Sequence, residues 1–149
     1  STDLVQDFNF ILIVIPTGPI NIPGIEYDYD SDQLRPNSNL VLDTLADMLL
    51  LNDNFRIKIN SHTDERGNND YNFRLSQRRA ASVVNYLISK GIEAERLQSE
   101  GFGETNPLVP NATTEEEHQR NRRTEFEILD QDYQPVDKHR YLKMKQKEE

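Results

Sequence analysis

Residues 55–91 read FRIKINSHTDERGNNDYNFRLSQRRAASVVNYLISKG, and one periodicity gives way to another within them. Over residues 55–61, apolar side chains alternate with charged or amide ones, which is typical of a strand with one buried face. Over residues 69–90, apolar side chains instead recur at helical spacing, and Gly91 suits the end of a helix. The stretch therefore predicts a strand and a long helix, joined by a polar loop.

Weaker patterns on both sides predict the remaining elements. Pro36 suits the first turn of a helix, and Thr114 to Glu117 fits a capping box that opens a short helix. The further elements that we expect are a strand from Ile20 to Tyr29 with a bend at Pro23-Gly24, a helix over residues 36–51, and strands over residues 97–102 and 122–129. The predicted fold class is α+β, with an element order close to βαβαββ.

The bulk composition limits the classes of function. The 149 residues have room for one ordinary domain, which we place at residues 20–130, between a flank or linker at 1–19 and a charged tail at 131–149. We expect the tail to be disordered or to form a peripheral helix. A net charge of -9 opposes contact with phosphate backbones, so nucleic acid is not an expected partner. The chain has no cysteine and therefore no disulfide framework.

No membrane span is expected in this chain. The longest apolar run, residues 10–15, is far shorter than the ~20 residues that cross a bilayer as a helix. The first residues do not resemble a signal peptide, so the chain looks like an excised or mature piece of a longer protein. We expect the anchor to the outer membrane to lie in the missing part.

Two opposite charges mark the junction between the central strand and the long helix. Asp64 lies in the loop, and two adjacent arginines follow on the helix. A helix turns about 100° per residue, so Arg78 points almost opposite the apolar face, whereas Arg79 lies on its shoulder with Asn72 and Leu75. An arginine fork and a carboxylate side by side suit a ligand that carries both charges, such as an amino acid head group. The same two side chains could instead simply pair with each other.

A longer series of residues along the chain matches a known pattern. It comprises Tyr29-Asp30, Thr63 to Gly67, Tyr71-Asn72, Leu75 to Ala80, Gly101 to Glu104, Pro107 and Asn121 to Phe126. In these residues the chain from about 22 to 129 resembles the OmpA-like peptidoglycan-binding domain, which also occurs in peptidoglycan-associated lipoprotein and in flagellar stator proteins. The resemblance implies a two-layer βαβαββ sandwich, with two main helices packed on a mixed four-stranded sheet.

The resemblance also implies a ligand and the residues that hold it. The ligand is peptidoglycan, bound noncovalently through the diaminopimelate of its peptide stem. The residues implied are Asp64 for the ammonium and Arg79 for the carboxylate, with Thr63, Asn72 and Leu75 as lining, Tyr29 and Asp30 facing from the first strand, and Glu65 and Arg66 as contacts like those of the lipoprotein branch. Tyr29 replaces the usual Phe of the family. We interpret Asn121 to Arg123 as a structural clasp beside the site.

The partners and location follow from the same resemblance. We expect peptidoglycan and other envelope or outer-membrane proteins as partners, and a periplasmic location attached to the outer membrane. Such a domain would anchor an outer-membrane protein or an envelope machine for secretion or motility to the cell wall. The alternative is a protein-interaction module of the envelope whose glycan site is non-functional.

Metal and catalytic functions are weaker interpretations. Three aspartates, at positions 28, 30 and 32, alternate as in a calcium loop, but Gln33 stands where glycine is required. The three histidines lack metal-ligand spacing, and His62 fits a packed or hydrogen-bonded role better. Ser61, His62 and Asp64 are too close in the chain to assemble a catalytic triad. We therefore expect no cofactor, no metal and no enzymatic activity.

Overall fold

The computed structural model describes residues 18–134, so most of the predicted flank and tail lies outside the described residues. The elements along the chain are β1 (Ile20–Asn21), η1 (Pro36–Ser38), α2 (Asn39–Leu51), β2 (Arg56–His62), α3 (Asn69–Ser89), η2 (Ala94–Arg96), β3 (Leu97–Gly103), α4 (Glu115–Asn121) and β4 (Arg123–Asp130). The strand and the long helix expected within residues 55–91 are both confirmed.

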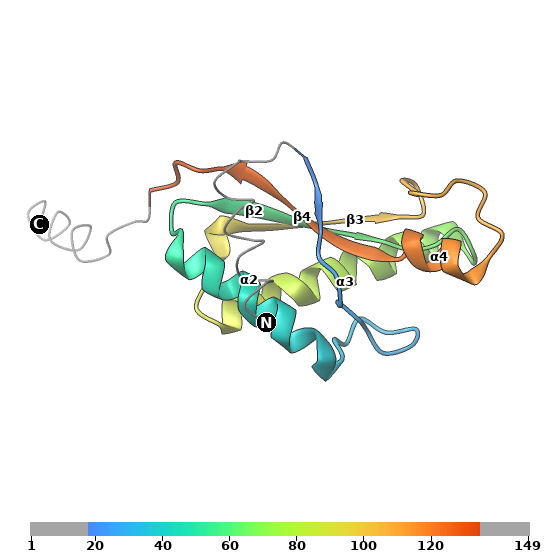
Figure 1. Cartoon of the computed structure of the whole chain (residues 1–149), viewed down its shortest axis with the longest axis horizontal. Helices are drawn as coiled ribbons and strands as arrows, with labels where there is room; N and C mark the ends of the chain where they lie inside the picture. Colours follow the sequence, from blue (N-terminus) through green and yellow to red (C-terminus); the bar gives the residue numbers. More distant parts are fainter. Residues whose placement is uncertain (1–17, 135–149) are drawn as a thin grey trace, which may run out of the picture.

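The strands form one mixed sheet in the order β1-β4-β2-β3. β2 runs parallel to β3 and antiparallel to β4, while β4 also pairs antiparallel with β1. The helices α2 and α3 lie together on one side of this sheet (Figure 1). The predicted α+β sandwich is therefore confirmed, and the short α4 between β3 and β4 begins with the predicted capping box.

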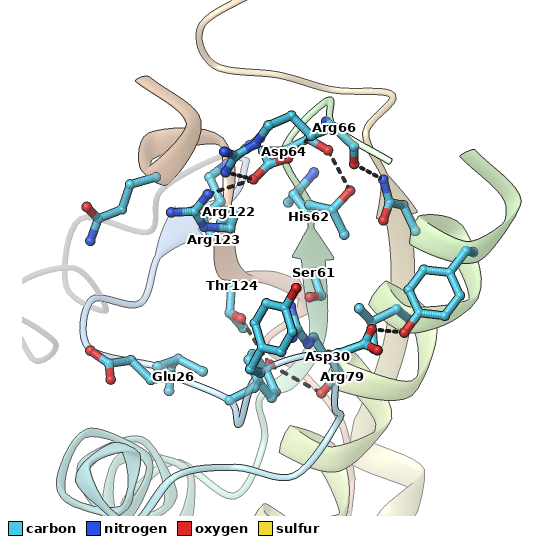
Figure 2. Close-up of a pocket in the computed structure, with 18 of the residues that line it drawn as sticks. Glu26, Asp30, Ser61, His62, Asp64, Arg66, Arg79, Arg122, Arg123 and Thr124 are labelled. Atoms are coloured by element: carbon cyan, nitrogen blue, oxygen red, sulfur yellow. Dashed lines mark hydrogen bonds and ion pairs between the residues drawn. The ribbon is translucent and has the colours of Figure 1, made fainter. Parts of the chain in front are cut away.

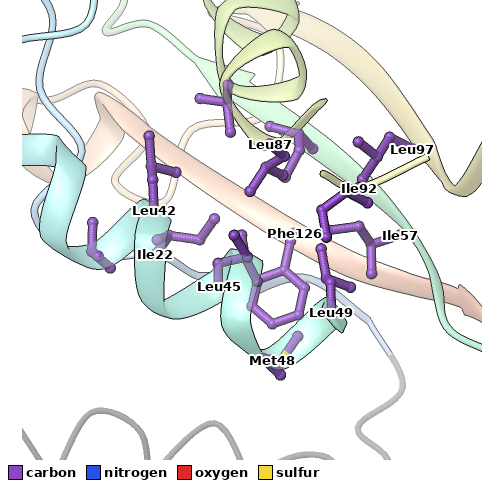
Figure 3. Close-up of a cluster of buried hydrophobic side chains, with 14 of the residues drawn as sticks. Ile22, Leu42, Leu45, Met48, Leu49, Ile57, Leu87, Ile92, Leu97 and Phe126 are labelled. Atoms are coloured by element: carbon purple, nitrogen blue, oxygen red, sulfur yellow. The ribbon is translucent and has the colours of Figure 1, made fainter. Parts of the chain in front are cut away.

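The core lies between the sheet and the two long helices. Ile57, Ile59 and Phe126 point from β2 and β4 toward the helices and are fully buried. Leu45 from α2 and Leu87 from α3 meet them in the same cluster (Figure 3). Alternate residues of β2 therefore face this layer, which is why the period of two was visible in the sequence.

The helix α3 packs unusually close to β3. A Cβ built on Gly101 would lie 2.2 Å from the backbone nitrogen of Gln77, so only glycine fits at this position. The hydroxyl of Ser76 accepts a hydrogen bond from the backbone N–H of Gly103 at 2.8 Å, which fixes the same contact. The first half of α3 is thus held firmly against the sheet.

A buried arginine, Arg96, lies beside the end of α2 and the turn before β2. Arg96 is 1% exposed, and its guanidinium donates to the backbone carbonyls of Leu49, Asn52 and Phe55 at 2.7, 2.7 and 3.0 Å. Glu93 provides the counter-charge at 3.1 Å. These carbonyls belong to the end of α2 and the turn before β2, where a helix leaves acceptors without partners. Arg96 therefore satisfies them.

The predicted first strand is wrong over most of its length. β1 ends at Asn21, because Pro23 has no N–H for the ladder and Gly24 adopts a positive φ of 82°. The following residues form a loop closed by an isolated bridge between Tyr27 and Leu34. Glu26 ties this loop to η1 through two backbone hydrogen bonds with the hydroxyl of Ser38.

Two further findings concern the edges of the described part. In residues 18–134, no helix combines the length and the apolar character needed to cross a membrane. Just after β4, the backbone N–H of Tyr133 donates to the carbonyl of Asn54 at 2.9 Å. The chain therefore stays attached to the turn before β2 for a few residues beyond the predicted domain end.

Candidate ligand-binding site

One cavity of about 770 Å³ opens where β2 ends and β4 begins. Its walls come from the loop around residues 25–30, the loop after β2, the first turns of α3, and α4 (Figure 2). Arginine and carboxylate side chains both line it. The volume falls in the range of about 300–1,000 Å³ that is usual for ligand pockets.

Asp64 lies in this cavity with its carboxylate fully engaged. Its Oδ1 accepts the backbone N–H of Arg66 at 2.9 Å, and its Oδ2 accepts the guanidinium of Arg66 at 2.9 Å and that of Arg122 at 2.6 Å. Burial by itself would raise the pKa of Asp64, but the hydrogen bonds from the two arginines outweigh it and hold that pKa well below its usual range. Asp64 is therefore a fixed negative charge.

Arg122 and Glu115 complete the charged network around Asp64. Glu115, in the first turn of α4, pairs with Arg122 at 2.6 Å and with Arg66 at 3.3 Å. Arg122 comes from a position 58 residues beyond Asp64, so nothing in the local sequence links the two. The sequence predicted a structural role for Arg122 beside the site, and its ion pair with Asp64 fits that role. Arg122 also lines the cavity.

Arg79 lies on another wall of the same cavity. Its Nε donates to the carbonyl of Ser31 at 2.8 Å, and its guanidinium carbon lies 4.7 Å from the ring centroid of Tyr27. Burial lowers the pKa of Arg79, an effect that the nearby tyrosines and aspartates oppose. Its two terminal nitrogens have no hydrogen-bond partner among residues 18–134. They remain available to an anion.

The helix phase predicted from the sequence is confirmed. Arg78 is exposed and pairs with Asp32 at 3.7 Å outside the cavity, whereas Arg79 is partly buried and lines it. No ion pair joins Asp64 to Arg79 in the described part of the chain, so the simple salt bridge between them is not formed. Figure 2 shows Asp64 and Arg79 on separate sides of the cavity.

Three other residues predicted around the two charges belong to the same cavity. Thr63, Asn72 and Leu75 all line the cavity and are buried. Asn72 donates from its side-chain amide to the carbonyl of Arg66 at 2.8 Å, which holds the loop after β2 against the start of α3. The loop that carries Asp64 is therefore braced by the helix that carries Arg79.

Tyr29 and Asp30 also line the cavity, from a loop rather than from the predicted strand. Asp30 has a positive φ of 52° and accepts a hydrogen bond from the hydroxyl of Tyr71 on α3. This contact raises the pKa of Tyr71. Tyr71 was not among the predicted site residues, although its place one residue before Asn72 put it on the first turn of the helix.

Glu65 is the predicted site residue that the structure does not bring to the cavity. It does not line the cavity, and its carboxylate accepts the backbone N–H of Asn111 at 3.0 Å. Asn121, fully buried, binds the backbone of Val109 through both atoms of its amide. Glu65 and Asn121 therefore both hold the long loop between β3 and α4, as a clasp beside the site.

His62 is a packed residue, as predicted. Its ring stacks on Phe102 with centroids 4.9 Å apart, and its Nε2 lies 2.8 Å from the carboxylate of Glu125. Arg123 donates to the same carboxylate at 3.0 Å. These hydrogen bonds outweigh the effect of burial and lower the pKa of Glu125. Arg123, which lines the cavity, is therefore already paired with a buried carboxylate.

With this geometry established, comparison with known proteins identifies the family. The OmpA family matches residues 26–122 of the chain, which include both Asp64 and Arg79. The chain belongs to the OmpA family. This OmpA-family chain is 43% identical over 103 residues to Outer membrane protein A of Bordetella avium, covering 69% of the chain and 53% of that relative. It is also 37% identical over 100 residues to a peptidoglycan-associated lipoprotein of Pseudomonas putida, covering 67% and 59%.

Two solved structures have a similar fold. A putative MotB-like protein from Desulfovibrio vulgaris superposes with a TM-score of 0.68 at 25% identity, covering 93% of this chain and 94% of that one. The cell wall anchor of the T6SS from Pseudomonas aeruginosa gives a TM-score of 0.64 at 25% identity, with coverage of 83% and 94%. The OmpA-family chain spans only part of the curated relatives that it matches, from 13% to 59% of their length.

Proposed function

We propose that this chain binds peptidoglycan noncovalently through the diaminopimelate of the peptide stem, and so anchors an outer-membrane protein or envelope complex to the cell wall. The observation that carries the proposal is the placement of Asp64 and Arg79 on separate walls of one cavity, not paired with each other. The names of two similar proteins support this kind of function: one relative is a peptidoglycan-associated lipoprotein, and one similar structure is a cell wall anchor.

The free end of diaminopimelate carries one ammonium and one carboxylate, and each has a partner in the cavity. Arg79 is fixed through its Nε and offers its two terminal nitrogens to the carboxylate as a bidentate fork. Because its guanidinium is partly buried and lies over Tyr27, water screens this interaction less than on an open surface. The carboxylate end of the ligand therefore meets a pre-oriented cation.

The ammonium end of the ligand binds Asp64 by replacing one of its existing hydrogen bonds. Both carboxylate oxygens already accept hydrogen bonds from arginines, so an incoming ammonium must replace one of them. The Arg66 side chain is 54% exposed, whereas Arg122 is 33% exposed and more firmly enclosed. We therefore assign the replaced contact to the guanidinium of Arg66, which then remains close enough to the ligand to touch it.

The remaining wall residues complete the site. Thr63, Asn72 and Leu75 line the cavity together with the two charges, and Asp30 lines it from the loop after β1. In this function the chain acts in the periplasm and forms no covalent bond with its ligand. Release of soluble muropeptides from sacculi incubated with the chain would show instead that it is an enzyme.

Cosedimentation with purified sacculi tests the proposal. We expect the unmodified chain to sediment with sacculi that contain diaminopimelate, and Asp64→Ala and Arg79→Ala to remain in the supernatant. Arg78→Ala is the matched control, because this adjacent arginine is exposed and pairs only outside the cavity. Equal sedimentation of all three variants would refute the assignment of the site.

The choice of sacculi tests the ligand. Sacculi with lysine in place of diaminopimelate lack the carboxylate that Arg79 is proposed to bind, so we expect weaker sedimentation with them. Equal binding to both types would refute diaminopimelate as the recognised group. Failure to bind either type would leave the protein-interaction module as the function that this fold serves.

A further inference from the structure

Two carboxylates and two arginines at the cavity form a closed ring in which the sign of the charge alternates. Asp64 contacts Arg66 at 2.9 Å and Arg122 at 2.6 Å. Glu115 contacts the same two arginines, at 3.3 Å and 2.6 Å. Figure 2 shows Arg66 and Arg122 together at the carboxylate of Asp64. Each arginine therefore bridges two carboxylates, and the ring as a whole is neutral.

Glu115 has a fixed backbone and an ionised side chain. It is the first residue of α4, which begins with the capping box formed by Thr114 and Glu117. The hydrogen bond from Arg122 lowers the pKa of Glu115, and the charge of Arg66 acts in the same direction. Its side chain is 62% exposed, whereas that of Asp64 is 11% exposed. Glu115 is therefore a permanent negative charge at the open edge of the cavity.

An ammonium that takes the place of Arg66 on Asp64 opens the ring at one contact. Asp64 keeps Arg122 and gains the ammonium, so its charge stays balanced. Arg66, in contrast, loses its shortest contact with a carboxylate, and the free energy of that loss reduces the affinity for the ligand. Among residues 18–134, the carboxylates that pair with Arg66 are those of Asp64 and Glu115. The state of Arg66 after the exchange thus depends on Glu115.

We infer that Glu115 is a positioning residue of the site, which holds Arg66 while the ligand ammonium occupies its place on Asp64. The inference rests on the proposed binding of diaminopimelate. Arg66 contacts Glu115 through Nη1 and Asp64 through Nη2 and Nε, so the contacts with Asp64 can break while the one with Glu115 persists. Every charged group then still has a partner of opposite sign, and the exchange leaves no unpaired guanidinium.

The role of Glu115 should be confined to one end of the ligand. Without its carboxylate, Arg66 is left with Asp64 as its ionic partner within residues 18–134 and competes more strongly with the ammonium. Arg79, which is proposed to bind the carboxylate of the ligand, takes no part in the ring. A ligand that lacks the ammonium does not need to open the ring. Its affinity should therefore not depend on Glu115.

Titrations of two ligands followed by NMR, which measures weak as well as tight binding, test the inference. The first ligand is a tripeptide that ends in diaminopimelate. In the second, hydrogen replaces the ammonium at the free end and the carboxylate is retained. We expect Glu115→Gln to weaken binding of the first ligand by about 2- to 5-fold, the effect of one exposed ion pair, and to leave the second within about 1.5-fold.

Glu116→Gln is the matched control for the change in net charge. Glu116 is exposed beside Glu115 on α4 and does not line the cavity, so its replacement should change neither affinity. A further comparison asks whether Glu115 acts through Arg66. In an Arg66→Gln chain the competing guanidinium is absent, so adding Glu115→Gln should cause no further loss for the first ligand.

The possible results separate the role of Glu115 from the site itself. Equal losses for both ligands, a loss that persists in the Arg66→Gln chain, or no loss when Arg66 is present would each overturn the role of Glu115 and leave the head-group site standing. If the unmodified chain bound neither ligand, the proposed function would be wrong as well.

Discussion

Replacing Arg96 by methionine should cost about 3–5 kcal/mol of the free energy of unfolding. The buried guanidinium donates to the carbonyls of Leu49, Asn52 and Phe55. Asn52 also accepts the N–H of Phe55, so the main loss falls on the other two carbonyls. Each buried acceptor left without a donor costs roughly 1–3 kcal/mol, so the two carbonyls account for most of the loss. The ion pair with Glu93 adds little, because the Glu93 side chain is 45% exposed.

Urea unfolding followed by circular dichroism measures this difference. The free energy of unfolding of Arg96→Lys should lie between those of the unmodified chain and Arg96→Met. Its ammonium keeps the positive charge but lacks the planar guanidinium that donates to three carbonyls at once. Arg120→Met is the control, since Arg120 is exposed on α4 and should change stability by less than about 0.5 kcal/mol. If Arg96→Met lost less than about 1 kcal/mol, the view that this arginine holds the end of α2 would be wrong.

Three further predictions concern the site. The pKa of Asp64 is lower in the folded chain than in the unfolded one. Its ionisation therefore stabilises the fold above about pH 4, and this contribution is lost as the pH falls further. The thermal midpoint of Asp64→Asn should decline less between about pH 4 and pH 2 than that of the unmodified chain. Glu65→Gln should retain binding to sacculi, because its amide oxygen still accepts the N–H of Asn111, while Glu65→Ala should weaken it; equal behaviour would argue against a positioning role. Gly101→Ala should unfold at least about 1 kcal/mol more easily, since the added carbon meets the backbone of Gln77, and unchanged stability would show that α3 can move away at no cost.

The parts of the fold that the sequence revealed are those with clear periodicity. Residues 55–61 alternate because one face of β2 is buried, and α3 shows its helical face because Val83 and Leu87 pack on the sheet. The phase of that helix was enough to separate Arg79 from Arg78. The segment after Ile20 misled the prediction because an irregular loop can also place apolar residues two apart, here Tyr27 and Tyr29.

The parts of the site that sequence reasoning missed depend on contacts between distant segments. The pairing of Arg122 with Asp64 requires β4 to lie beside β2, which local pattern does not encode. Glu65 was predicted to touch the ligand because the Glu65-Arg66 pair resembles that of the lipoprotein branch, whereas its carboxylate here accepts the N–H of Asn111, 46 residues further along the chain. A contact between residues so far apart in the chain cannot be seen in the local sequence.

The position of β4 has a mechanical consequence. The strand begins beside the cavity at Arg123 and ends at Asp130, at the far end of the sheet (Figure 1). It is hydrogen-bonded on both sides, to β1 and to β2, and these antiparallel bonds lie across the strand direction. A pull between a ligand in the cavity and the chain beyond Asp130 would act along the strand, so that the bonds on both sides share the load in shear instead of opening one after another.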